Sequence, residues 1–382
     1  MRQWAIRIIL SAAALMVAGS ATARPGARLP SKFMRGVNFA NVHRFDDGYG
    51  SQRSVEQLKK LRDLGVRWIA ITPFAFQPKL NSDHLRRFGR THANGNASHR
   101  MHGRREDEKL IKMVAQAHHL GIRVMIKPHI WSRAFRTKGG WHGTIDQNSP
   151  AAHQRWWASY QKFAMHYAKL AQRAHADGYC VGTELVKMTG QYPAQWRSLI
   201  KKVRKIYKGL VTYAANWGGE YAKIPFWNAC DVIGINAYFP LNAKPGASVS
   251  TLVQKWQPWI RKVGKIQAKF NKPVVFLEVG YRAVSGTYRK PWIDGHGKVN
   301  QQAQARAYKA MFRAWAAKRW WRGAFFWKTF TDPSAIDRDD GGGFRFMDRA
   351  AAKVVRHWYA DARQTPATST RPQTGQKTAA GQ

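Results

Sequence analysis

The chain has 382 residues, with 64 Lys and Arg against 21 Asp and Glu, which gives a formal net charge of +43. Because 44% of the residues are hydrophobic and 17 are Trp, the chain can fill a core, which excludes a disordered protein. Only two cysteines are present, Cys180 and Cys230, which excludes a disulfide-stapled scaffold. We expect both as buried free thiols, because the two predicted strands that carry them are not neighbours.

The positive charge is spread along the whole chain. No block of six or more basic residues occurs, and no spacing typical of RNP, zinc-finger or helix-turn-helix motifs is present. Basic residues often lie one turn apart on helix patterns, as Lys59, Lys60 and Arg62 do. We therefore predict a cationic solvated surface and no nucleic-acid partner, while an acidic polysaccharide stays open as a partner.

Residues 1–23 are typical of a secretory signal peptide. Arg2 and Arg7 precede an apolar stretch over 8–18, and Ala21-Thr22-Ala23 resembles a cleavage site. The apolar stretch is shorter than the roughly 20 residues that a membrane-spanning helix needs, although an uncleaved anchor is the alternative. We therefore expect export to a periplasm or beyond, with no membrane span after cleavage and with residues 24–33 as a linker.

Residues 34–363 show eight short apolar runs of strand type, each followed by an amphipathic stretch. The predicted strands are Gly36–Phe39, Trp68–Thr72, Ile122–Lys127, Gly178–Leu185, Leu210–Ala215, Val232–Asn236, Val274–Gly280 and Gly323–Lys328. The predicted helices include Val55–Leu64, Glu106–His119, His153–Ala174, Pro193–Tyr207, Thr251–Phe270 and Gln301–Lys318.

Eight alternating strands and helices favour the α/β class and a single, monomeric (β/α)8 barrel. The competing fold is a doubly wound open sheet, which would need a Gly-rich phosphate turn after an early strand, and G-x-G-x-x-G is absent there. Residues 364–382 are polar and low in complexity, so we predict a disordered tail.

Two of the six glutamates end predicted strands in apolar sequence. Glu184 follows Tyr-Cys-Val-Gly-Thr, and Glu278 follows Val-Val-Phe-Leu, whereas Glu220 lies in a Gly-Gly-Glu-Tyr loop. A barrel carries its chemistry at the carboxyl ends of its strands, and an unpaired buried carboxylate is costly. One interpretation is that each pairs with a buried Arg or Lys. The other is glycoside hydrolysis, in which one carboxyl donates a proton and the other attacks the sugar.

Polar and aromatic residues at the other strand ends extend the candidate site. Singly, each is typical of a packed ring or a loop polar group, but together they occur on seven of the eight strands. The first strand end carries His43 as well as Asn38, and the candidate sugar contacts are Asn38, His129, Trp131, Asn216, Trp217, Asn236, Tyr238, Tyr281, Trp292 and Trp327. We predict no metal site and no cofactor. The Asp337-Arg338-Asp339-Asp340 segment lacks EF-hand spacing, so a solvated loop is expected there.

Three segments resemble glycoside hydrolase family 113, within the clan of retaining (β/α)8 glycosidases. They are Val-Gly-Thr-Glu-Leu at 181–185, Leu277 to Arg282 followed by Gly286 and Pro291-Trp292, and Gly323 to Lys328. The similarity covers about residues 34–345, and the known activity of this family is endo-β-mannanase. The resemblance implies Glu184 as general acid/base and Glu278 as nucleophile.

One position departs from the clan. Most members have Asn directly before the acid/base, where it binds the sugar 2-hydroxyl, whereas Thr183 stands here. We expect Asn216 to supply this contact, which strengthens in the transition state.

The sequence therefore predicts an exported retaining β-glycosidase, most simply one that cleaves β-1,4-mannan within the chain. The alternatives are a non-catalytic cationic barrel that binds anionic polysaccharide, and a nucleic-acid or envelope-binding protein. The latter leaves both strand-end glutamates unexplained. Because a strongly positive protein lowers the pKa of its carboxyl groups, we also expect an acidic pH optimum.

Overall fold

Eight parallel strands close into a barrel in the computed structural model, which describes residues 29–30, 32–42, 48–87, 97–137, 139–294, 297–333 and 341–360. Around the barrel the order is β1-β11-β10-β9-β8-β7-β5-β2, and β1 pairs with both β11 and β2. The strands are β1 (Met34–Ala40), β2 (Trp68–Ile71), β5 (Arg123–Ile126), β7 (Gly178–Thr183), β8 (Leu210–Asn216), β9 (Ile233–Asn236), β10 (Val274–Val279) and β11 (Trp321–Phe330). The predicted barrel is confirmed, and the doubly wound sheet is excluded.

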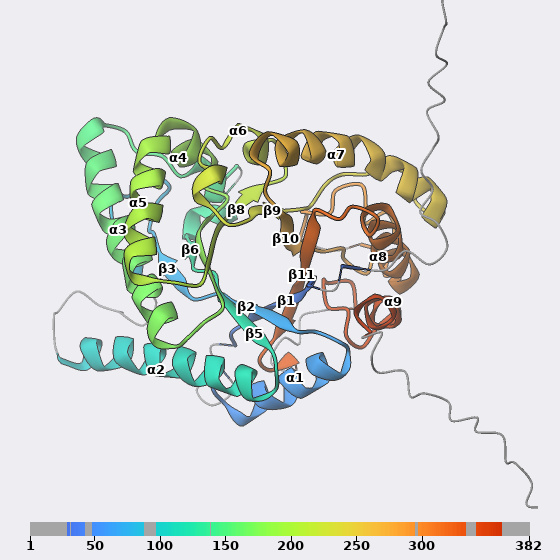
Figure 1. The fold of residues 1–382 in the computed structure, drawn as a ribbon, viewed down its shortest axis with the longest axis horizontal. Helices are drawn as coiled ribbons and strands as arrows, with labels where there is room; N and C mark the ends of the chain where they lie inside the picture. The colour runs from blue at the N-terminus through green and yellow to red at the C-terminus, as the bar shows by residue number, and fades with distance from the viewer. Residues whose placement is uncertain are drawn as a thin grey trace, which may run out of the picture.

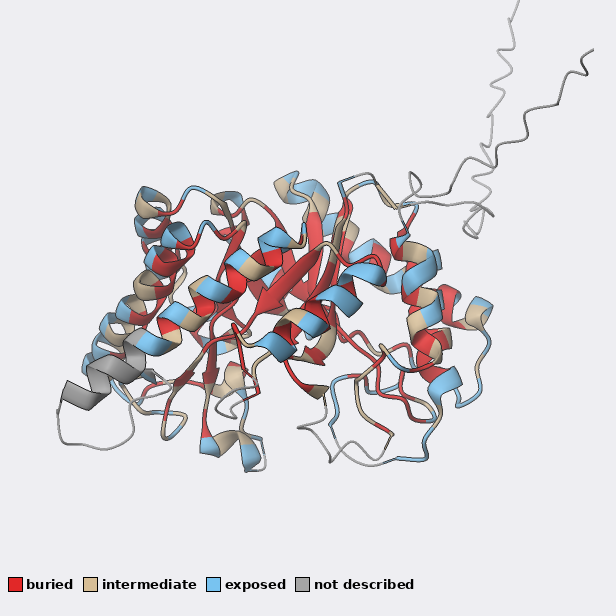
Figure 2. Ribbon diagram, turned by 90° about the horizontal axis from the view of Figure 1, so that it is seen from below, coloured by how far each residue is buried: buried red, intermediate tan, exposed pale blue. Residues whose placement is uncertain are grey.

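The helices form a ring around the strands (Figure 1). They are α1 (Gln52–Asp63), α2 (Ala97–His119), α3 (Pro150–Arg173), α4 (Val186–Gln191), α5 (Pro193–Ile206), α6 (Glu220–Lys223), α7 (Val249–Phe270), α8 (Gln301–Trp315) and α9 (Ala350–Tyr359). Short 3-10 turns lie at Arg133–Arg136, His142–Thr144 and Trp227–Ala229. Figure 2 shows buried residues on the strands and on the inner helix faces, with exposed residues outside.

Local sequence sets several helix boundaries. The Ser51 and Ser149 side chains accept hydrogen bonds from the backbone N–H groups of Ser54 and Ala152, which caps the starts of α1 and α3. Gly65 follows α1 with φ of +92°, a left-handed conformation that glycine adopts without steric cost. An added Cβ at Gly65 would lie 2.5 Å from the Tyr359 carbonyl oxygen, so the glycine also allows α9 to pack closely.

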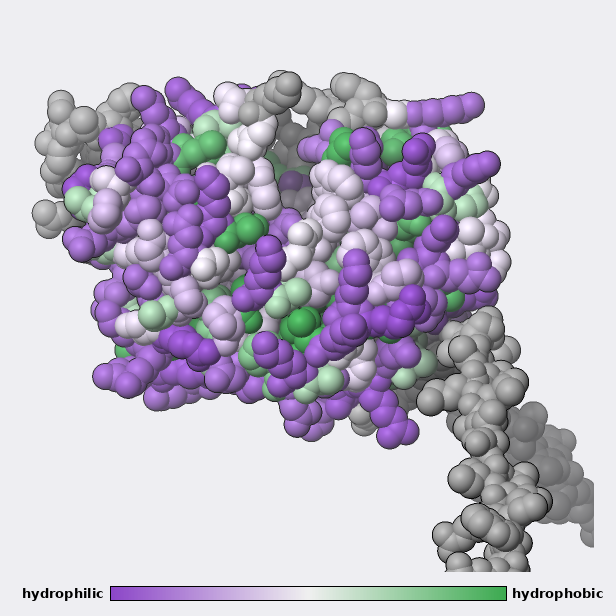
Figure 3. All heavy atoms as spheres, turned by 90° about the horizontal axis from the view of Figure 1, so that it is seen from above, coloured by the Kyte–Doolittle hydropathy of each residue, from purple (hydrophilic) through white to green (hydrophobic). Residues whose placement is uncertain are grey.

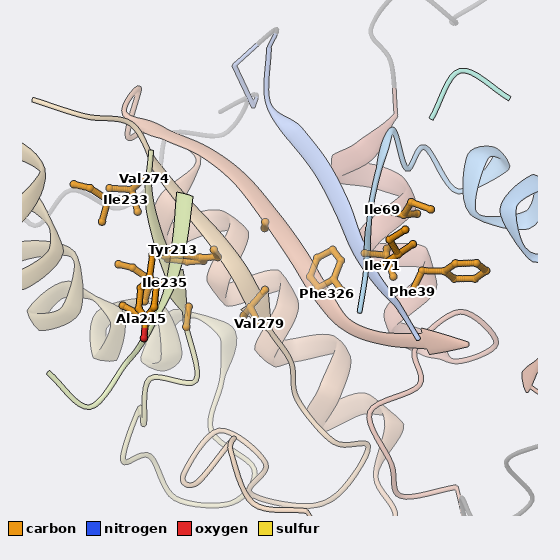
Figure 4. Packing of buried hydrophobic residues seen from close by; sticks show 14 of the residues in the cluster. Phe39, Ile69, Ile71, Tyr213, Ala215, Ile233, Ile235, Val274, Val279 and Phe326 are labelled. Atoms are coloured by element: carbon orange, nitrogen blue, oxygen red, sulfur yellow. The ribbon is translucent and has the colours of Figure 1, made fainter. Parts of the chain in front are cut away.

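Alternate strand residues pack inside and outside the barrel. Trp68, Met125, Leu277 and Phe325 belong to the cluster that fills the interior. The outward set packs under the helices and includes Phe39, Ile69, Tyr213, Ile235, Val279 and Phe326 (Figure 4). The near-continuous apolar strands of the sequence thus follow from burial on both faces.

A small second sheet extends the barrel beyond the carboxyl ends of two strands. It contains β3 (Phe74–Phe76), β4 (Arg86–Arg87) and β6 (His129–Trp131) in the order β4-β3-β6. Because β3 follows β2 and β6 follows β5, this sheet lies at the end of the barrel where the strand-end residues gather.

Both cysteines are free and buried, as predicted. No helix among the described residues is long and apolar enough to cross a membrane. Figure 3 shows one flank of the barrel, where hydrophilic side chains dominate and hydrophobic ones are scattered among them. The predicted signal peptide and tail, His43, and Asp337 to Asp340 lie outside the described residues.

Candidate active site

Glu278 lies near the end of β10, with both carboxylate oxygens bound. The Lys127 Nζ lies 2.7 Å from Oε1, and the Tyr238 hydroxyl donates to Oε2 at 2.9 Å. The Lys127 side chain is 0% exposed and that of Glu278 is 7% exposed, so the ion pair is buried. Two donors from different strands therefore fix the orientation of this carboxylate.

His129 stands beside the same carboxylate as a neutral imidazole. Its Nε2 is 3.8 Å from Glu278 Oε1, and its ring stacks on Trp327 at a centroid distance of 6.2 Å. Burial, together with the nearby positive charges of Lys127, His142 and Lys328, lowers the pKa of His129 well below its usual value. The imidazole therefore contributes a polar edge and no charge.

Glu184 follows β7 in a left-handed conformation, with φ of 52°. Its Oε1 accepts a hydrogen bond from Asn216 Nδ2 at 3.0 Å. Burial raises its pKa to about 8, with further contributions from the carboxylates of Glu278 and Glu220, while hydrogen bonds from Asn216 and Asn236 act in the opposite direction. This carboxyl therefore retains its proton near neutral pH.

Glu220 is a third carboxyl group near Glu184, and it is buried. Oε1 accepts hydrogen bonds from the Tyr213 hydroxyl (2.7 Å) and the Thr189 hydroxyl (2.8 Å), and Oε2 accepts one from the Asn216 backbone N–H (2.6 Å). Burial raises its pKa to about 7. The predicted loop at this position is in fact the first turn of α6, which begins at Glu220.

Polar side-chain atoms at the strand ends include several that are buried without a hydrogen-bond partner among the described residues. They include Asn38 Oδ1, Thr72 Oγ1, His129 Nε2, Thr183 Oγ1 and Asn236 Oδ1, which come from the ends of different strands or their extensions. Asn38 Nδ2 donates to the Leu277 carbonyl at 3.0 Å, so this side chain reaches the strand that carries Glu278. Unpaired buried polar atoms are costly, and a ligand rich in hydroxyl groups would supply the missing partners.

Aromatic rings lie beside the carboxylates. Trp217, which follows Asn216, stacks on Trp292 at a centroid distance of 4.5 Å, and Trp292 is 41% exposed. Trp327 is partly buried, with the Lys328 ammonium 4.6 Å from its ring centroid, and the Trp327–Lys328 peptide bond is cis. Aromatic rings that are at least partly exposed, at the end of the barrel that carries the carboxyls, are suited to the apolar faces of sugar rings.

Residues 39–339 match the family model described as Glycoside Hydrolase Family 113. The chain belongs to glycoside hydrolase family 113. It is therefore a glycoside hydrolase, and the sequence-based assignment to this family is confirmed.

Solved structures of this family are also similar to the chain. A GH113 beta-1,4-mannanase in a complex is 26% identical, with a TM-score of 0.69 over 86% of this chain and 99% of that one. The GH113 beta-mannanase AaManA from Alicyclobacillus acidocaldarius, in complex with ManMIm, is 26% identical, with a TM-score of 0.71 over 86% and 97%. No curated protein sequence matches the chain significantly.

The fold alone is shared with more distant enzymes. A β-glucuronidase from Ruminococcus gnavus is 12% identical, with a TM-score of 0.56, and the match covers 86% of this chain and 50% of that one. The barrel architecture therefore extends beyond family 113.

Most of the residues predicted as sugar contacts lie at one end of the barrel. Contacts around the two glutamates connect Asn38, His129, Asn216, Asn236, Tyr238 and Trp327, and Trp217 and Trp292 stack beside them. Both amide atoms of Asn216 already have protein partners, because Oδ1 accepts from the Gly218 N–H at 2.6 Å. Its contact with a sugar hydroxyl stays a prediction.

Two predicted contacts are not part of this set. Tyr281 is buried and packs edge-on against Tyr308 of α8, so the structure places it in the layer between barrel and helices and corrects its assignment to the cleft. The reason is local: strand residues alternate, and Tyr281 continues the outward side of β10. Trp131 stacks on Phe76 within the small β4-β3-β6 sheet, at the rim.

Lys127 and Glu220 were not predicted from the sequence. Lys127 stands at the end of the third barrel strand, and a lone Lys in an apolar run was the available signal for a buried ion pair. Glu220 had no such signal, because its partners Thr189, Tyr213 and Asn216 come from separate parts of the chain. Among the described residues, no group of three or more His, Cys, Asp and Glu could hold a metal ion.

Proposed function

We propose that this family 113 member is a retaining β-glycosidase that hydrolyses β-1,4-mannan or a closely related β-linked hexose polymer. The observation that carries the proposal is the contrast between two strand-end carboxyls. Glu278 is bound by an ammonium and a phenol, whereas Glu184 is bound by amides and has a pKa of about 8. One nucleophilic carboxylate and one protonated carboxyl are what double displacement requires.

In the first step, a Glu278 oxygen attacks the anomeric carbon while the bond from that carbon to the leaving oxygen breaks. The proton on Glu184 passes to the leaving oxygen, which departs as an alcohol. In the second step, Glu184, now a carboxylate, takes a proton from water as the water oxygen attacks the same carbon. Glu278 is released, and two inversions give net retention.

Mannan is the proposed substrate because the similar solved structures of 25–26% identity are named as beta-mannanases, two of them as beta-1,4-mannanases. The unpaired atoms of Asn38, His129 and Asn236 would meet sugar hydroxyls, and Trp217, Trp292 and Trp327 would meet ring faces. Asn216 is proposed to contribute to the 2-hydroxyl contact that most members of the clan make with an Asn at the position of Thr183.

The test is release of reducing ends from a panel of β-mannan, glucomannan, cellulose, xylan and an acidic polysaccharide, at low and high salt. We expect release of reducing ends from β-mannan with little dependence on salt. Proton NMR should show that the β anomer of the product forms first. Salt-sensitive binding to the acidic polymer without any release would instead support the non-catalytic cationic barrel.

The raised pKa of Glu184 predicts the alkaline side of the pH profile. Glu184 must be protonated to act as acid, so kcat/KM should be retained below about pH 8 and fall as the pH rises through this pKa. A measured pH dependence of kcat/KM on a soluble manno-oligosaccharide checks this. Loss of activity that is complete by about pH 6 on the alkaline side would contradict the assignment of Glu184.

This prediction replaces the acidic optimum expected from composition. The net charge of +43 would lower carboxyl pKa values over long distances through solvent. Burial and two neighbouring carboxylates act on Glu184 at short range and in the opposite direction, and the short-range effects dominate.

Export is a further part of the proposal. The signal-like segment 1–23 supports it, and the N-terminal mass of the protein recovered from outside the cytoplasm tests it. We expect the mature chain to begin directly after Ala23.

A further inference from the structure

A cavity lies on the same side of the barrel as the catalytic carboxyls. It has a volume of about 590 Å³ and lies between the loop before α3, the first turns of α3, and the junction of α4 and α5. Helices in a β/α barrel begin at the end where the strands finish, so the starts of α3 and α5 belong to the catalytic face. The volume lies within the range of about 300–1,000 Å³ typical of ligand sites.

The lining of this cavity carries amides and rings. Gln147 and Gln195 contribute carboxamides, and Trp157, Tyr192 and His153 contribute rings. None of the described residues that line it is Lys, Arg, Asp or Glu, in a chain with 64 basic residues. Such a lining is unsuited to an anion and matches a neutral, hydroxyl-rich ligand.

Two polar atoms of the lining residues lack protein partners. Gln147 is 6% exposed, and its Oε1 has no hydrogen-bond partner among the described residues, whereas its Nε2 donates to the Ser82 carbonyl. Trp157 Nε1 is likewise buried and unpartnered within the described structure. Gln147 Oε1 is an acceptor and Trp157 Nε1 is a donor. A sugar hydroxyl group can donate to the first and accept from the second.

The ring positions are fixed. His153 contacts both Asp146 (3.1 Å) and the Ser149 carbonyl (3.0 Å), and its ring lies 4.8 Å from that of Tyr192. Trp157 packs edge-on against Trp196 and Tyr192. Asp146 also forms an ion pair with Lys187 of α4. Because α4 begins two residues after Glu184, this ion pair connects the cavity to the segment that carries Glu184.

We propose that this cavity binds a sugar unit of a neutral β-linked polysaccharide away from the catalytic cleft. It would anchor the polymer and leave the chemistry of the cleft unchanged. The proposal rests on the proposed function for the polymer class, but its binding step is independent of hydrolysis.

The test uses Trp157→Phe, which keeps a ring but removes the indole N–H, and Gln147→Leu, with Trp358→Phe on α9 as the matched control. Calorimetry in the non-cleaving Glu278→Ala background would measure binding of mannohexaose, cellohexaose and xylohexaose. We expect each cavity variant to weaken binding of one of them by about 3- to 10-fold, the loss of one hydrogen bond, while Trp358→Phe has no effect.

With catalytic residues intact, KM on polymer should rise by a similar factor, while kcat on an aryl β-mannobioside stays unchanged. Oligosaccharide binding that is insensitive to both cavity variants would overturn the proposal, whatever the protein hydrolyses. Binding of cellohexaose that depends on Trp157, without hydrolysis of mannan, would keep the cavity and overturn the mannanase assignment.

A different observation assigns a role to Glu220. Its three hydrogen bonds lead to Glu184 by two routes. Through Tyr213, whose hydroxyl accepts from the Leu185 backbone N–H at 2.7 Å, it fixes the residue that follows Glu184. Through the Asn216 backbone N–H it fixes the side chain that donates to Glu184 Oε1.

We infer that Glu220 is a positioning residue for the acid/base in the proposed reaction. It is 4% exposed, and no ion pair to it is found among the described residues. The two carboxylate oxygens of Glu220 accept hydrogen bonds from three donors. In a Gln side chain an NH2 group would replace one of these oxygens and would face a donor without an acceptor. Among the described residues, the charged or titratable groups near Glu184 include Glu220, Glu278 and Tyr238, and Lys127 and His129 contact Glu278 in turn.

The test is Glu220→Gln, with Glu108→Gln on the exposed face of α2 as control. We expect kcat to fall by about 10- to 100-fold with KM changed less than about threefold, as for other residues that orient a catalytic group. The alkaline limb of kcat/KM should move to lower pH, because the carboxylate that raises the pKa of Glu184 is gone.

Tyr213→Phe separates orientation from charge, since it breaks the route to Leu185 but leaves Glu220 in place. It should lower kcat and leave the alkaline limb near its original pH. Carbon-13 NMR titration of the Glu184 carboxyl gives the same pKa comparison without turnover, so it stands even if no substrate is found. An unchanged Glu184 titration and kcat in Glu220→Gln would overturn the inference.

Discussion

Glu278→Ala should lower hydrolysis of β-mannan by about 10⁴-fold or more, because the covalent step loses its nucleophile. Added azide should restore turnover of an activated aryl β-mannoside and yield an α-glycosyl azide, since a single displacement inverts the anomeric carbon. The measurement is product analysis by proton NMR with and without azide. Full mannan activity in this variant would end the assignment of Glu278.

The same change carries a cost in stability that must be measured separately. It leaves the buried Lys127 ammonium without its carboxylate, and breaking a buried pair costs about 3–5 kcal/mol. A lowered Tm is therefore expected, with a near-native circular dichroism spectrum at low temperature. Glu278→Gln keeps the volume and one oxygen for Lys127 or Tyr238, so it should lose activity with a smaller drop in Tm.

Glu184→Ala should reduce hydrolysis of β-mannan by about 10²- to 10⁴-fold, the usual contribution of a general acid/base. The effect should be much smaller on the first step with a dinitrophenyl leaving group, which departs without protonation. Azide should then accelerate turnover and give a β-glycosyl azide, because azide attacks the glycosyl-enzyme without a general base. The opposite azide anomers from the two variants distinguish the two roles.

Loss of the alkaline limb is a second expected property of Glu184→Ala. In the native enzyme this limb reflects the carboxyl whose pKa is about 8, and in the variant no such group remains. A pH profile that keeps the same limb after the substitution would assign the limb to another group and contradict the role of Glu184.

Much of the fold follows from the sequence because its signals are local. Burial of each strand on two faces requires continuous apolar runs, and each such run appears between amphipathic stretches. Glycine at a helix end, as at Gly65, marks where a helix turns into a strand. α9 is not among the predicted helices, and its position depends on contacts such as that of the Tyr359 hydroxyl with the Ala324 carbonyl.

In the candidate site, too, the sequence indicates some features and leaves others undetermined. Glu184 and Glu278 stand out in sequence because a lone carboxyl in an apolar strand has a high energetic cost unless it has a purpose or a partner. The facing direction of Tyr281 did not follow from its place after a strand, since one step along the backbone moves a side chain from cleft to helix layer.

The barrel, its family and the two strand-end glutamates could be predicted from the sequence, because periodicity, burial and short motifs are properties of neighbouring residues. The charge of +43, taken alone, pointed in the wrong direction for the pKa of Glu184. Only the tertiary structure decided which groups surround each carboxyl. Lys127 and Tyr238 bind Glu278, and Asn216, which is itself held by Glu220, binds Glu184. These partners are far apart in sequence, and Coulomb and desolvation energies depend on distance and burial, which closure of the barrel sets.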